Sequence, residues 1–151
     1  MTSLLALALT LFVAPAPESA EDALKLATKL TTEGSANFDK KDAKALAESY
    51  TEDATVTLMS KDKETGLPKL DVKRGRGEIQ ELYQGLFKDA GPIHSRNDVE
   101  HAKLVGDFLI INGVFDPDLG YSFKIAFTQI RFKQNDRWLI LSMELMIQEE
   151  K

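Results

Sequence analysis

The 151-residue sequence contains no cysteine, and this absence removes several kinds of chemistry at once. Without a thiol the chain has no disulfide, no thiolate metal site, no cysteine nucleophile and no lipidated cysteine. The absence says little about compartment, because a domain of this size buries enough surface to be stable without disulfides. With 43% hydrophobic residues, the chain is expected to form one domain with a sizeable core.

Basic stretches are also missing. The formal net charge is −5, and acidic and basic residues are mixed along the chain. Binding to nucleic acid needs a basic stripe that neutralises phosphates, and binding to a membrane surface needs a basic amphipathic helix. We therefore expect neither nucleic acid nor membrane as a partner of the mature chain. The segment "RGRG" at 74–77 lacks the Lys and the Ser or Thr of a phosphate-binding P-loop, and nothing indicates a cofactor.

The N-terminal segment 1–20 predicts a signal peptide. Positions 4–14 form a run of about eleven mostly apolar residues, which is too short to cross a bilayer but typical of a signal-peptide core. The start of the segment has no Lys or Arg, so a buried N-terminal helix is the alternative. Export predicts a secreted or periplasmic protein, cut near Ala20, with a single mature domain at 21–151. The alternative leaves the chain in the cytoplasm.

The remaining sequence alternates between helical and strand periodicity. Apolar residues at helical spacing predict a helix that starts at Glu21 and stops at Gly34, a second that Asp42 caps and that runs to Tyr50, and a third at 78–87. Alternating apolar residues predict strands at 53–59, 96–105, 108–115, 121–133 and 137–147, with a surface loop or loose hairpin at 60–74. This order indicates an α+β fold in which helices cover one face of an antiparallel sheet.

Four motifs in order carry a resemblance to a known family. They are a capped helix ending in "SYTEDA", a Gly-Arg helix start in "RGRGEI", a Gly-Asp strand turn in "GDF" and a Trp in the last strand, "RWLI". Over residues 37–147 the chain resembles the nuclear transport factor 2-like superfamily, in its SnoaL-like branch. The resemblance implies a curved antiparallel sheet, a cone-like α+β barrel packed against about three N-terminal helices, with an internal pocket and a homodimer formed through the sheet. Such folds include enzymes, binding proteins and assembly domains.

The resemblance allows a test of known chemistries. In the steroid isomerases of this superfamily, the base, the tyrosine donor and the protonated acid correspond here to Leu58, Gly34 and Thr128, which cannot perform that reaction. A second family pattern has a His-x-His pair after the Trp, and Ser142 and Glu144 occupy those positions here. Glu144 is the candidate catalytic acid or base if its strand face lines the pocket. Otherwise it is a solvated carboxylate at the pocket mouth or a dimer edge, so the question of an enzyme stays open.

The expected ligand-binding residues are aromatic side chains with a few polar anchors. Arg131 could hold a ligand carboxylate through two hydrogen bonds, or serve only as a charge on the sheet surface. Core packing explains the aromatic residues equally well. The predicted set is Tyr83, Phe87, Phe127, Arg131, Trp138 and Ser142.

The segment "HSRNDVEH" contains the two histidines of the chain. Strand alternation places His94 and His101 on opposite faces, whereas a metal site needs both imidazoles to converge. We therefore expect a solvated surface of mixed charge there and no metal site.

Two functions follow. The first is an exported SnoaL-like domain that binds a small, largely apolar organic ligand in its pocket, with or without lyase, isomerase or cyclase chemistry. The second is a non-catalytic dimerisation or assembly module with a vestigial cavity. An enclosed void at which Glu144 converges with another polar group supports the first. A cavity filled by Trp138, Phe87 and Met143 supports the second.

Overall fold

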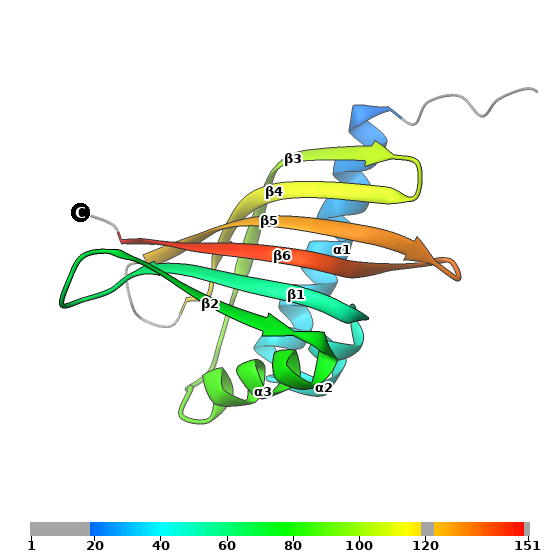
Figure 1. The fold of residues 1–151 in the computed structure, drawn as a ribbon. Coiled ribbons are helices and arrows are strands. Elements are labelled where there is room, and N and C mark those ends of the chain that lie inside the picture. The colour runs from blue at the N-terminus through cyan, green and yellow to red at the C-terminus, as the bar shows by residue number, and fades with distance from the viewer. Residues whose placement is uncertain (1–18, 119–122, 150–151) are drawn as a thin grey trace, which may run out of the picture.

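The computed structural model describes residues 19–118 and 123–149, and Figure 1 shows its fold. Apart from Ser19 and Ala20, the predicted signal peptide lies outside the described residues. No helix in the described part of the chain is long and apolar enough to cross a membrane. The elements are α1 Ala20–Asp39, α2 Ala43–Glu48, β1 Tyr50–Lys61, β2 Pro68–Arg74, α3 Gly75–Phe87, β3 Arg96–Val105, β4 Phe108–Asp116, β5 Phe123–Gln134 and β6 Arg137–Glu149.

The first helix is longer than predicted. It begins where the Ser19 hydroxyl accepts a hydrogen bond from the Asp22 backbone N–H, at 3.1 Å. It continues past the predicted stop at Gly34 and ends at Asp39. A glycine inside a helix costs about 1 kcal/mol relative to alanine. Burial of the Phe38 ring in the core, in the last turn, offsets that cost.

The second helix is shorter than predicted. The Asp42 carboxylate caps it by accepting the Ala45 N–H at 2.9 Å, as expected. The helix ends at Glu48, however, and the predicted last helical residue, Tyr50, already belongs to β1. The register explains this difference, because Tyr50 pairs with Ile140 of β6 and its side chain is fully buried.

The sheet has six strands in the order β2-β1-β6-β5-β4-β3, and it stays open. All neighbouring pairs are antiparallel except β1 and β6, which run parallel. The segment predicted as a loop or loose hairpin contains β2, which pairs with β1 from Lys61–Pro68 to Thr55–Arg74. In Figure 1 α1 crosses behind the sheet, and α2 and α3 lie beyond its β2 end.

Directly paired residues on neighbouring strands share a face of the sheet, which defines its two sides. The inner face packs against the helices and carries buried residues such as Leu109, Ile111 and Met143. The outer face carries the paired side chains of Phe108 and Phe132. Further outer-face partners are Ile110, Ile130, Asn112, Thr128, Ser142, Glu144, Met146, Thr57, Met59, Leu70 and Val72.

A β-bulge in β6 overturns the predicted alternation of that strand. Ile130 pairs with Ser142, but the next residue, Arg131, pairs with Ile140, so Leu141 is an extra residue in β6. The bulge reverses the alternation, and Ile140 therefore shares the inner face with Met143. Strict alternation through 137–147 would place these two residues on opposite faces.

Candidate functional site

Arg131 of β5 is buried on the inner face, with 4% of its surface exposed. Its Nε donates to the Gln129 side-chain oxygen at 3.0 Å, and its Nη1 donates to the Trp138 carbonyl at 3.3 Å. Both acceptors are neutral, and no carboxylate within the described residues forms an ion pair with this guanidinium. Burial lowers the pKa of Arg131 to about 10. The charge of Glu33 favours the charged form of Arg131 without forming an ion pair with it. A buried cation that lacks an ion-pair partner is still costly, which makes Arg131 the principal candidate site residue.

Two tyrosines lie in the same interior. The hydroxyl oxygens of Tyr50 and Tyr83 are 2.8 Å apart, and the Tyr50 hydroxyl also contacts the Met143 sulfur at 3.5 Å. Burial raises the pKa of both phenols, while the charge of Arg131 acts in the opposite direction. The interior can therefore offer a guanidinium and hydroxyl groups to an anion.

The four predicted aromatic residues all lie on the inner side. Tyr83 and Phe87 of α3 stack with ring centres 6.1 Å apart, and Phe38 meets Phe87 edge-on at 5.0 Å. Phe127 is buried beneath α1, and Trp138 packs at the margin of the same cluster. These rings pack against one another as a core, and Tyr83 and Phe127 are less than a tenth exposed.

Ser142 and Glu144 lie on the outer face, away from this interior. Ser142 pairs with Ile130 and Thr55, and Glu144 pairs with Thr128 and Thr57. Glu144 is exposed. The condition that made Glu144 a candidate acid or base, a strand face lining an internal pocket, is therefore not met. Its position matches the alternative of a solvated carboxylate.

A second bulge changes the predicted arrangement of the histidine segment. Val99 pairs with Gly113, but His101 pairs with Asn112, so Glu100 is the extra residue in β3. His101 consequently shares the outer face with Asp98, whereas strict alternation had placed it opposite. His94 precedes the strand.

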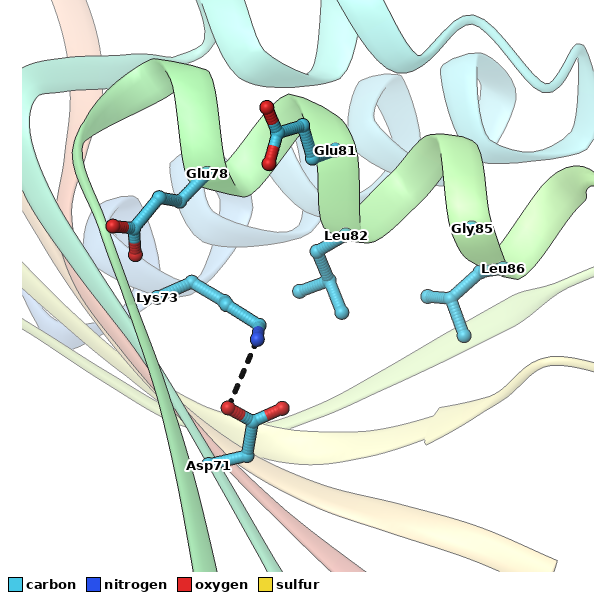
Figure 2. A pocket seen from close by; sticks show the side chains of 7 residues that line it. All are labelled: Asp71, Lys73, Glu78, Glu81, Leu82, Gly85 and Leu86. Atoms are coloured by element: carbon cyan, nitrogen blue, oxygen red, sulfur yellow. Dashed lines mark ion pairs between the residues drawn. The ribbon is translucent and has the colours of Figure 1, made fainter.

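Two hollows among the described residues are open grooves rather than enclosed cavities. One, of about 600 Å³, lies between β2 and α3 and is shown in Figure 2. The other, of about 730 Å³, lies where Phe108 and Phe132 meet the start of β1 and Arg76. No residue predicted to bind a ligand lines either groove.

Sequence reasoning missed two members of the interior site. The sequence could have indicated Gln129, because this residue lies two positions before Arg131 on the same strand face and its side-chain oxygen can accept the Arg131 N–H. No feature of the sequence indicated Tyr50, because its spacing from the preceding apolar residues fitted the end of a helix. The bulge in β6 places Ser142 on the outer face, whereas strict alternation would have kept it on the face of Ile140.

No family model matches the sequence, and no curated protein matches it. Solved structures do match the fold. An NTF2-like protein of unknown function from Shewanella baltica has a TM-score of 0.65 at 13% identity, covering 88% of this chain and 99% of that one. A protein of unknown function with a cystatin-like fold from Nostoc punctiforme has a TM-score of 0.61 at 15% identity, covering 88% and 96%.

A third structure, from Xanthomonas campestris, is described as a putative calcium/calmodulin-dependent protein kinase II association domain. Its TM-score is 0.60 at 16% identity, covering 84% of this chain and 88% of that one. At such low identities the structural likeness shows the fold and leaves the function open. The chain therefore has the nuclear transport factor 2-like, cystatin-like fold that its sequence motifs predicted.

Proposed function

We propose that this chain is an assembly domain that pairs with a second copy through the outer face of its sheet. The observation that carries the proposal is the uncovered outer face, because the helices pack on the inner face. Large apolar side chains stand exposed on it: Phe108 is 40% exposed, Met146 47% and Leu70 63%. The pairing places them in two groups, Phe108 with Phe132 and Met146 with Leu70, on either side of a polar row that contains Glu144. Exposed apolar groups of this kind on a soluble domain are typical of an interaction site.

The dimensions of the face suit a symmetric dimer. Six strands about 4.8 Å apart span roughly 24 Å, and nine residues of strand span roughly 30 Å, so one face offers on the order of 700 Å². Stable interfaces bury about 800 Å² per partner. A two-fold axis would pair the same surface on both copies, which is the commonest arrangement in soluble oligomers.

The packed interior also supports assembly rather than the binding of a ligand inside the domain. The aromatic rings around Phe38, Tyr83 and Phe87 fill the space between helices and sheet. A structure with this fold is itself described as a putative association domain, which is consistent with a role of the fold in assembly.

The test is the oligomeric state of a face variant. Phe108→Asp places a charge on the outer face at an exposed position, so the fold is kept and self-association should fall at least tenfold. Leu24→Asp, at a similarly exposed position on α1, is the matched control and should leave it unchanged. Sedimentation velocity over a dilution series measures both. A wild-type chain that stays monomeric at all concentrations contradicts the proposal.

A second candidate function rests on Arg131. Its buried guanidinium, bonded only to neutral acceptors, would gain a counter-ion from the carboxylate of a small, largely apolar ligand. Such a ligand would have to displace some of the aromatic side chains that fill the interior. Native mass spectrometry of the purified chain, followed by denaturation, tests this function. A co-purified organic acid present in the wild type and lost in Arg131→Met supports it, and an empty wild type in several expression hosts contradicts it.

We also propose that the chain is exported, on the basis of the apolar run at 4–14. Expression in a Gram-negative host, with fractionation and intact-mass measurement, tests the location. Cytoplasmic protein that still carries Met1 contradicts export.

A further inference from the structure

The groove between β2 and α3 has a feature that the proposed function does not use, which is the free edge of a strand along one wall. β2 is the last strand of the sheet and, among the described residues, pairs with β1 alone. Its outward backbone N–H and C=O groups are therefore available to another strand. An added strand would extend the sheet on the side of β2 that faces away from β1, along this groove.

The groove walls combine apolar and acidic groups. Leu82 and Leu86 lie one turn apart on α3 and point toward β2, and Asp71 and Lys73 point from β2 toward them (Figure 2). Leu86 is 49% exposed. Between them Gly85 adds no side chain, and nothing lies within 4 Å of where its Cβ would be. The groove is therefore open at this point of α3.

The charges of the groove are not balanced. The residues that line it include three carboxylates, of Asp71, Glu78 and Glu81, and one ammonium, of Lys73, so its net charge is two negative. Lys73 is paired with Asp71 at 3.0 Å, and Glu78 accepts the Arg74 backbone N–H at 2.8 Å. Glu81 has no ion pair or hydrogen bond within the described residues. Among the three carboxylates of the groove, that of Glu81 is therefore the one available to bind a cation.

We propose that the β2–α3 groove binds an extended peptide that adds a strand to β2 and carries a basic side chain between aliphatic ones. In an added strand every second side chain points toward α3. The aliphatic side chains would pack on Leu82 and Leu86, and the basic one would meet Glu81. A second copy of this chain fits less well, because it would bring the same two negative charges to the groove.

A designed peptide tests the proposal. The probe is fluorescein-labelled Thr-Leu-Thr-Lys-Thr-Leu-Thr with a C-terminal amide, and the control has Glu in place of Lys. We expect saturable fluorescence anisotropy with the Lys peptide and binding about fivefold weaker to Glu81→Lys. The preference should reverse, so that Glu81→Lys binds the Glu peptide better than the wild type does. Glu100→Lys, at an exposed position on the other edge strand, is the matched control and should behave as wild type.

Three results would overturn the inference. One is equal binding of the Lys and Glu peptides to the wild type. Another is unchanged affinity for a peptide whose central Thr residues are replaced by Pro, because proline cannot complete a strand ladder. The third is self-association that Glu81→Lys abolishes, which would assign the groove to a second copy. Peptide binding should survive in Phe108→Asp, so failure of this inference and failure of the assembly proposal are distinguishable.

Discussion

The Tyr50 hydroxyl of β1 lies 2.8 Å from the Tyr83 hydroxyl of α3, and this contact joins the sheet to the helix layer inside the core. Both side chains are buried, Tyr50 completely and Tyr83 to all but 8%. Each hydroxyl therefore depends on the other for its hydrogen bond, with the Met143 sulfur as a weaker partner of Tyr50.

We expect Tyr50→Phe to leave the Tyr83 hydroxyl buried without a partner and to cost about 1–3 kcal/mol of the free energy of unfolding. Removing both hydroxyls should cost less than the sum of the two single changes, because no orphaned donor remains. Urea unfolding of the wild type, both single variants and the double variant measures this coupling. Strictly additive losses would show that the two hydroxyls do not depend on each other.

The same pair predicts a loss of stability at alkaline pH. Burial raises the pKa of Tyr50 well above 10.0 and also raises the pKa of Tyr83, so folding favours the protonated phenols. Stability from a raised pKa is fully present below the unfolded value, near 10, and is lost as the pH rises above it. Burial of Arg131 acts with the opposite sign, because its pKa falls to about 10 and the folded state releases that proton first.

Arg131→Met removes the contribution of Arg131 to the pH dependence of stability, which opposes that of the tyrosines. It also removes the positive charge that lowers the pKa of Tyr50 and Tyr83. We therefore expect its free energy of unfolding to fall more steeply than that of the wild type between pH 9 and about 11. Urea titrations across this range measure the slope, and tyrosinate absorbance at 295 nm reports the phenols directly. Parallel slopes for the two proteins would contradict the assigned coupling.

We expect position 113 in β4 to tolerate only glycine. A Cβ at this position would lie 2.2 Å from the Asp98 carbonyl oxygen and 3.0 Å from the Phe127 ring. The first neighbour is backbone beside the β3 bulge and cannot rotate away. Gly113→Ala should therefore cost about 1–3 kcal/mol.

The control for that substitution is Gly34→Ala in α1, where nothing lies within 4 Å of the added methyl group. It should stabilise the fold by about 0.4–1 kcal/mol. Thermal unfolding followed by circular dichroism measures both variants. Equal effects of the two alanines would contradict the steric argument.

The elements that periodicity predicted well are those whose alternation is uninterrupted, such as Phe108 to Phe115 in β4. Faces were predicted wrongly where a bulge adds one residue, at Leu141 in β6 and Glu100 in β3. A bulge depends on how two strands fit together, and a single strand carries no signal of it. β2 was harder to recognise because its charged residues alternate with only Leu70 and Val72 in an exposed edge strand. Arg131 and Phe127 lie on a regular stretch of β5, where alternation predicts their shared face correctly.

Glu144 offers the last prediction, because it is a carboxylate on the face that we propose pairs with a second copy. It lies between Thr57 and Thr128 in the middle strands of the face proposed to pair with a second copy. Dimerisation would desolvate this carboxylate in each copy, and desolvation of a charge is costly without a partner cation. Glu144→Gln removes that cost and should tighten self-association several-fold, as measured by sedimentation equilibrium. Weaker association in Glu144→Gln would mean that the carboxylate bonds across the interface, and no change would place it outside the contact.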